Sequence, residues 1–104
     1  MIPPRGNEKL NDGRKGDIAE YYAITWLWDQ GYEVFMNAGS QGPIDMVAFD
    51  PVNNVTKLID VKNARTDARG GCSRMRTKLQ KELGVVFISF DRETRKLKWI
   101  QHRN

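Results

Sequence analysis

Apolar residues recur with helical spacing between residues 14 and 30, and Gly31 supplies the stop signal that follows many helices. On a helical wheel the apolar positions form a broad side that neighbouring aromatic residues extend around the helix: Ile18, Ala19, Tyr22, Ala23 and Trp26, then Tyr21, Ile24 and Trp28. Glu20 falls inside this apolar girdle, between Ile24 and Leu27. A helix that is apolar nearly all round is covered on more than one side. We therefore expect it to pack on a sheet and also to meet a second subunit.

The rest of the chain reads as short strands, with one further short helix. Strands are predicted at residues 32–36, 44–49, 55–61, 85–90 and 96–100, and the short helix at 77–83. Residues 85–90 are a continuous apolar run, as in a central buried strand. The order α-β-β-β-α-β-β predicts an α/β fold with a mixed sheet flanked by helices. We expect one domain over residues 1–104, with 1–13 as a flexible arm and 62–76 as a mobile basic loop.

Charged residues interrupt two of these apolar strands. Asp45 lies in the second predicted strand, and Asp60 and Lys62 lie at the end of the third. Buried charge is costly unless it is paired. Asp60 and Lys62 are two residues apart on a strand, so their side chains share one face. A turn centred between Val52 and Asn53 pairs residues whose numbers sum to 105, which sets Asp45 opposite Asp60 with Cβ atoms roughly 5 Å apart.

Two opposed carboxylates repel each other unless a cation lies between them. A hard cation with oxygen ligands, Mg²⁺ or Mn²⁺, suits such a pair. Each residue also has an ordinary structural interpretation. An Asp-x-Lys strand is most often an exposed salt bridge, Asp45 could simply precede a turn, and Glu20 could pair with Lys62. Taken one at a time these interpretations are favoured, but the convergence of three carboxylates and a lysine on an apolar surface favours a metal site.

The composition is that of a globular protein with a mildly basic charge balance. Of the 104 residues, 39% are hydrophobic and 29% are charged, and the net charge is +4. Cys72 is the single cysteine, so no intramolecular disulfide can form. The first residues lack the apolar segment of a signal peptide, and no apolar run approaches the ~20 residues of a membrane helix. We expect a soluble intracellular protein of the cytoplasm without membrane association. A phage protein that acts inside its host cell also fits this expectation.

Positive charge is concentrated in residues 62–81. Seven cations against one acid, Asp67, leave an excess of six: Lys62, Arg65, Arg69, Arg74, Arg76, Lys78 and Lys81. Charge runs are usually solvated surface, but this one directly follows the Asp-x-Lys strand, and the DNA backbone is its natural counterpart. Phosphate contacts give affinity without reading sequence. Nothing here resembles a helix-turn-helix, a zinc finger or a homeodomain, so recognition of DNA shape is favoured over recognition of a long sequence.

Four motifs in order resemble the PD-(D/E)xK nuclease superfamily. They are Gly16-Asp17-Ile18-Ala19-Glu20, Gly31-Tyr32-Glu33-Val34, Gly42-Pro43-Ile44-Asp45-Met46-Val47-Ala48 and Leu58-Ile59-Asp60-Val61-Lys62. The pattern is similar to that of archaeal Holliday junction resolvases, of a small bacterial nuclease-like family, and of small phage and intron-encoded endonucleases. The resemblance covers residues 13–65, while 66–104 match only in element order. Asp60 stands where these relatives usually have Glu, and Ile44 separates Pro43 from Asp45.

This resemblance implies a restriction-endonuclease-like core and metal-dependent hydrolysis of DNA phosphodiester bonds. Asp45, Asp60 and the Val61 carbonyl would hold Mg²⁺ (or Mn²⁺), and Glu20 would bind it directly or through water. Lys62 would orient the attacking water. Ser40 resembles a serine that resolvases keep near the scissile phosphate, and the basic residues that follow, Arg65, Arg69, Arg74, Arg76 and Lys78, would bind DNA.

The substrate and the assembly are also expectations. We expect a homodimer selective for branched or otherwise structured DNA, as in recombination by Holliday junction resolvases. The alternatives are a sequence-specific homing or restriction-like endonuclease, and a nuclease fold that has lost activity and only binds DNA. The lack of room for a recognition domain disfavours the first alternative, and the intact set of Glu20, Asp45, Asp60 and Lys62 disfavours the second.

Overall fold

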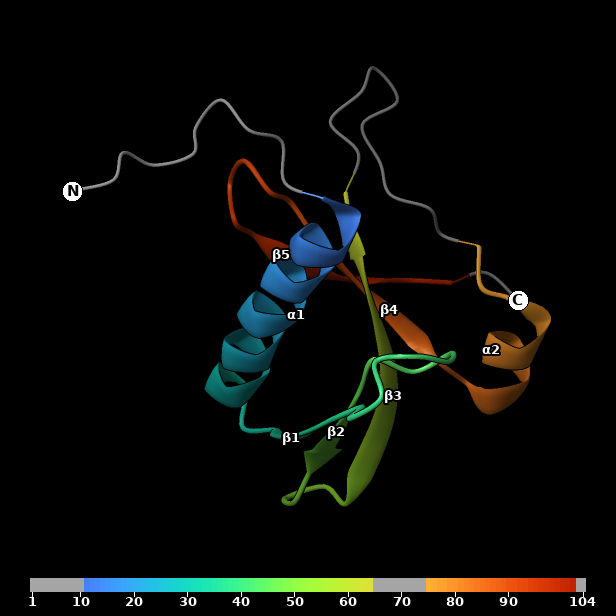
Figure 1. The fold of residues 1–104 in the computed structure, drawn as a ribbon. Coiled ribbons are helices and arrows are strands. Elements are labelled where there is room, and N and C mark those ends of the chain that lie inside the picture. The colour runs from blue at the N-terminus through green and yellow to red at the C-terminus, as the bar shows by residue number, and fades with distance from the viewer. Residues whose placement is uncertain (1–10, 65–74, 103–104) are drawn as a thin grey trace.

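The predicted order of elements is present in the computed structural model, which describes residues 11–64 and 75–102 (Figure 1). The elements are α1 (Asp12–Asp29), β1 (Glu33–Met36), β2 (Met46–Asp50), β3 (Val55–Asn63), α2 (Lys78–Leu83), β4 (Val86–Phe90) and β5 (Leu97–Ile100). The proposed N-terminal arm falls largely outside the described residues, as do positions 65–74 of the basic loop. The prediction of an α/β fold with a mixed sheet flanked by helices is confirmed.

The sheet has five strands in the order β1-β2-β3-β4-β5. All neighbours are antiparallel except β3 and β4, which are parallel. A parallel pair requires a crossover connection, and α2 lies within it. In the β2–β3 hairpin Met46 pairs with Ile59 and Asp50 with Val55, so each pair sums to 105. The predicted hairpin register is confirmed.

Helix α1 covers one face of the sheet. Asn11 caps its start, because the Asn11 side chain accepts a 2.7 Å hydrogen bond from the backbone N–H of Arg14. The helix therefore begins two residues before the predicted position. Ala19, Ala23 and Leu27 are fully buried on its inner side. The core between helix and sheet consists of Ala23, Ile24, Leu27, Met46, Ala48, Ile59 and Ile88.

The opposite face carries a smaller apolar cluster and the shorter helix. Its buried residues are Val85, Phe87 and Ile100, with Ile44 and Leu58 packed beside them. Figure 1 shows α1 and α2 on either side of the central strands β3 and β4. Odd-numbered Ile59 packs toward α1, while even-numbered Asp60 bonds to α2. Asp60 and Lys62 therefore lie on the face away from α1.

Two strand boundaries differ from the prediction. Strand β3 continues through Lys62 and Asn63, which were expected to begin the basic loop. Parallel pairing with β4 prolongs it, since Asn63 pairs with Phe90 and the N–H of Ala64 donates to the Phe90 carbonyl. Strand β2 begins at Met46, so Asp45 directly precedes the strand. Across the described part of the chain, no helix is both long enough and apolar enough to cross a membrane.

Candidate active site

Asp45 is the loop residue directly before β2. Strand β3 extends past this point, beyond its last pairing with β2. The Asp45 backbone N–H donates to the Ile59 carbonyl at 2.8 Å, although Met46 is the register partner of Ile59. Asp45 and Met46 on one strand therefore both oppose Ile59 on the other, which is the arrangement of a β-bulge. The Asp45 side chain then takes the place of a backbone partner, because its Oδ2 accepts a 2.7 Å hydrogen bond from the N–H of Val61. The bulge aims this carboxyl at the part of β3 that β2 leaves unpaired.

The Asp45 carboxyl lies against the β3 backbone at Val61, next to Asp60. Burial raises the pKa of Asp45 to about 7, helped by the hydrogen bond to Asp60 and by the negative charges of Asp60 and Glu20. The hydrogen bond from Val61 opposes this shift. Burial and nearby carboxyl groups therefore make the negative charge of Asp45 unfavourable in this site. A cation bound beside Asp45 would offset that charge.

Asp60 and Lys62 share a face, as their spacing predicts. Lys62 Nζ lies 3.2 Å from Asp60 Oδ2 and also stands over the Phe87 ring, 5.3 Å from its centroid. Asp60 is only 8% exposed, whereas the Lys62 side chain is 40% exposed. The ammonium group therefore remains accessible to water and to a substrate. The predicted alternative, in which Lys62 pairs with Glu20, is not the ion pair that the structure shows.

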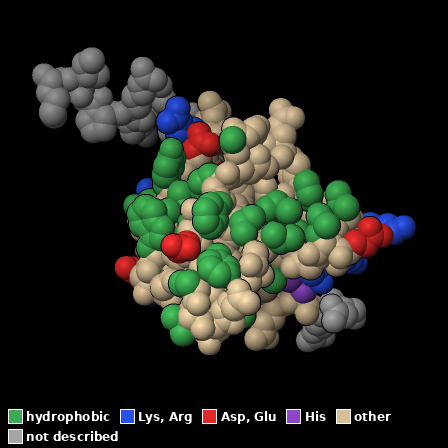
Figure 2. Space-filling model, turned by 90° about the horizontal axis from the view of Figure 1, so that it is seen from below, with side chains coloured by type: hydrophobic (Ala, Val, Ile, Leu, Met, Phe, Trp, Pro, Cys, Tyr) green, Lys and Arg blue, Asp and Glu red, His purple; other side chains and the backbone are tan. Residues whose placement is uncertain are grey.

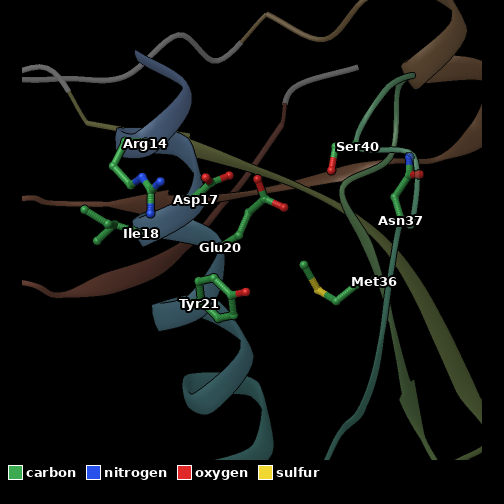
Figure 3. A pocket seen from close by; sticks show the side chains of 8 residues that line it. All are labelled: Arg14, Asp17, Ile18, Glu20, Tyr21, Met36, Asn37 and Ser40. Atoms are coloured by element: carbon green, nitrogen blue, oxygen red, sulfur yellow. The ribbon is translucent and has the colours of Figure 1, made fainter. Parts of the chain in front are cut away.

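Glu20 lies on α1 and lines a pocket of about 380 Å³. The pocket is lined by Arg14, Asp17, Ile18, Glu20, Tyr21, Met36, Asn37 and Ser40. Figure 3 shows Glu20 of α1 and Ser40 of the loop after β1 facing each other across it. Burial raises the pKa of Glu20, with further contributions from Asp17 and Asp60. Glu20 is therefore close enough to feel the charge of Asp60.

The loop between β1 and β2 connects the pocket to the carboxyl pair. The Asn37 side chain donates to the carbonyls of Gln41 (2.7 Å) and Ile44 (2.9 Å), and its backbone N–H donates to the Asp45 carbonyl. Ser40 is exposed and has a positive φ of 55°, which is uncommon for a residue other than glycine. Asn37 thus holds the chain around Asp45 in place while Ser40 stays free to meet a ligand.

The donor set fits a hard divalent cation with open coordination positions. Within residues 11–64 and 75–102, no group of three or more His, Cys, Asp or Glu side chains is placed to hold a metal ion. Asp45 and Asp60 supply two carboxylates. The N–H and C=O of one strand residue point to the same neighbour, so the Val61 carbonyl faces the same edge as its N–H. Mg²⁺ typically binds one or two carboxylates and completes its shell with water and substrate phosphate.

The predicted DNA-binding residues are placed unevenly. Lys78 is exposed at the start of α2. Arg76 is half-buried, and its guanidinium donates a 3.1 Å hydrogen bond to the Val85 carbonyl, so part of its role is to hold the chain before β4. Arg65, Arg69 and Arg74 lie outside the described residues.

Two residues of the site are not apparent from the sequence alone. Asn37 reads as an ordinary loop residue, and no local signal marks its contacts. Gln80 is buried, and its side chain reaches Asp60 from α2. The Thr77-x-x-Gln80 spacing is a capping-box signal at the start of α2, which the sequence predicted correctly. The contact between Gln80 and Asp60 depends on the tertiary fold.

Comparisons with known proteins place this geometry on a fold seen in a nuclease. No family model matches the chain, and neither does any curated protein. Six solved chains match, among them the structure of a bacterial homing endonuclease, I-Ssp6803I, at 20% sequence identity and a TM-score of 0.66. The match covers 88% of this chain and 66% of the endonuclease chain. At this level of identity the comparison establishes a shared fold.

Proposed function

We propose that this protein is a metal-dependent DNA endonuclease of the PD-(D/E)xK type, hydrolysing phosphodiester bonds with Mg²⁺ or Mn²⁺. The observation that carries the proposal is the placement of the Asp45 carboxyl on the Val61 N–H, next to Asp60 and its ion-pair partner Lys62, where the β2–β3 pairing ends. The fold shared with a homing endonuclease supports it. A bound metal would stabilise negative charge on the phosphate and lower the pKa of the attacking water.

The side chains divide the remaining work. Asp45 and Asp60 hold the cation together with the Val61 carbonyl. Lys62, which is accessible and anchored on Asp60, orients the attacking water and helps stabilise charge that develops on the phosphate. Glu20 lies across the pocket from Ser40 and would bind the metal directly or through a water molecule. Ser40 and the basic residues around α2 position the phosphate backbone.

The proposal has two substrate versions. The first is selectivity for branched or otherwise structured DNA, as in Holliday junction resolvases, and the charge pattern without a recognition motif favours it. The second is sequence-specific cleavage, as in homing or restriction-like endonucleases, and the structural likeness to a homing endonuclease favours it. The chain spans 66% of the length of that endonuclease chain.

We also propose that the protein acts as a homodimer. Several large apolar side chains of α1 and β1 remain exposed, among them Tyr21 (71%), Trp28 (59%) and Phe35 (58%). Figure 2 shows hydrophobic side chains spread over much of one face, with few acidic side chains among them. Apolar surface of this kind often marks a protein interface. Light scattering on the parent and on a Trp28→Lys variant tests this, and a monomeric parent would exclude a stable dimer.

The test of the main proposal is incubation with four-way junction, flap, nicked and linear duplex DNA, with Mg²⁺ or with EDTA. We expect cleavage that requires the metal and that is lost in Asp45→Ala and Lys62→Ala. Binding of DNA without cleavage of any substrate would instead establish a binding module. Faster cleavage of the junction than of linear duplex would support structure selectivity, and cleavage of linear DNA at one sequence would support the homing version.

A further inference from the structure

Gln80 connects three parts of the chain through one buried side chain. It lies on α2 and is 5% exposed. Its Nε2 donates to Asp60 Oδ2 at 2.8 Å and to the Pro43 carbonyl at 2.9 Å, and its Oε1 accepts from the N–H of Thr77 at 3.0 Å. The amide thus touches the carboxylate on β3, the loop two residues before Asp45, and the start of α2.

The orientation of this amide is determined by its partners. A backbone N–H can only donate, so it requires the amide oxygen. A carbonyl and a carboxylate accept, so they require the NH₂ group. Reversing the amide would set like groups against each other at all three contacts. The capping box at Thr77 therefore holds both amide protons toward Pro43 and Asp60.

Two donors among the described residues use the same oxygen of Asp60. Lys62 Nζ lies 3.2 Å from Oδ2, which is also the oxygen that accepts from Gln80. These contacts leave Oδ1 as the oxygen available to a cation. The bond to Pro43 at the same time anchors the segment that carries Asp45. One amide therefore constrains both carboxyls of the pair relative to each other.

We propose that Gln80 is a positioning residue for the metal site, which sets the spacing and orientation of Asp45 and Asp60. The inference rests on the proposed function, because it concerns the same carboxyl pair. Side chains that orient metal ligands typically change metal affinity by about 10- to 100-fold when they are removed. Gln80 acts through Asp60 and Pro43 and touches no reacting atom in this role.

The test measures Mn²⁺ binding to the whole protein without DNA, by calorimetry, for the parent, Gln80→Met and Thr77→Ala. Gln80→Met keeps the side-chain volume and removes both amide donors. Thr77→Ala removes the hydroxyl of the same capping box but keeps the backbone N–H that orients Gln80. We expect Mn²⁺ affinity to fall about tenfold or more in Gln80→Met and to change less than about twofold in Thr77→Ala. Thermal unfolding of both variants reports the loss of the cap separately.

Gln80→Asn is the second variant should Gln80→Met fail to fold. Its amide is one methylene shorter, so it keeps a polar group at the buried position but does not span the gap to Asp60 and Pro43, and the same loss of affinity is expected. Equal affinity in the parent and a folded Gln80 variant would overturn the inference alone. Equal losses of Mn²⁺ affinity in Gln80→Met and Thr77→Ala would also overturn the inference, because they would show that the affinity depends on the capping of α2. A parent that binds no Mn²⁺ would overturn the proposed function as well.

Discussion

Asp45 and Asp50 stand at the two ends of one strand and have opposite electrostatic surroundings. Asp50 closes the hairpin turn, where its carboxylate accepts from the side chain of Asn53 at 2.7 Å and from the N–H groups of Val52 and Asn53. These hydrogen bonds, the Asn53 side chain first, lower the pKa of Asp50. At the other end, burial and the neighbouring carboxyls raise the pKa of Asp45 to about 7.

The difference separates a structural aspartate from a candidate functional one. Asp50 is stabilised as an anion by donors that lie within three residues of it, so its charge supports the turn. Asp45 accepts one backbone hydrogen bond, from Val61, but it is partly buried next to the carboxyl group of Asp60. Its negative charge is therefore unfavourable unless a cation binds beside it. Carboxyl groups whose pKa is perturbed in this way are concentrated at functional sites. Asparagine at each position removes the charge and keeps an oxygen acceptor, which makes the two variants a matched pair.

The largest expected effect is on DNA cleavage. Asp45→Asn removes the charge that we propose binds the metal, while its side-chain oxygen still accepts from Val61, so we expect cleavage to fall about 1,000-fold, equivalent to about 4 kcal/mol. Asp50→Asn lies at the far end of β2 and should cleave at the parent rate. Initial rates on the best substrate with Mg²⁺ measure both. Comparable losses in the two variants would mean that Asp45 matters only for folding.

The second effect is stabilisation by metal. A ligand that binds only the folded state at 100 times its dissociation constant stabilises it by about 2.7 kcal/mol. We expect Mn²⁺ at that level, near pH 8, to raise the free energy of unfolding of the parent and of Asp50→Asn by about this amount. Asp45→Asn should gain little. Urea unfolding with Mn²⁺ or with EDTA provides the measurement, and an equal gain in all three proteins would place the metal elsewhere.

The third effect is the dependence of stability on pH without metal. An unfolded aspartate ionises near pH 4, whereas folded Asp45 holds its proton to about pH 7. Between these values the folded state binds the extra proton, so the free energy of unfolding falls as pH rises. Because Asp45 is only half-buried, solvent screening limits the loss to about 1 to 2 kcal/mol. Urea unfolding of the EDTA-treated protein at pH 5 and pH 8 should show this loss in the parent and a smaller loss in Asp45→Asn.

The same two aspartates show what the sequence could predict. The Asp50-Pro51-Val52-Asn53-Asn54 turn is a local signal, and the register that it implies, with partner numbers summing to 105, holds along β2 and β3. The shared face of Asp60 and Lys62 follows from strand alternation and is also confirmed. These features depend on residues close together in the chain.

The environment of Asp45 depends on distant residues and could not be predicted in the same way. Its bulge against Ile59 is a deviation from the regular ladder that alternation does not encode. The contact of Gln80 with Asp60 spans 20 residues and requires the crossover that makes β3 and β4 parallel. The same pairing carries β3 through Lys62 and Asn63, beyond the predicted end of the strand. Tertiary packing determined each of these features.

The smallest expected effect is at the turn and has the opposite sign. Since the folded pKa of Asp50 is lowered, its contribution to stability is present above the unfolded pKa and is lost as pH falls through the folded value. Asp50→Asn should therefore be less stable than the parent at pH 6, and this difference should shrink on acidification toward pH 3. Urea unfolding of the two proteins, both with EDTA, at pH 6 and pH 3 measures the difference. If the difference instead stays constant with pH, then the Asp50 oxygens support the turn as hydrogen-bond acceptors whose charge contributes nothing, and the contrast with Asp45 rests on Asp45 alone.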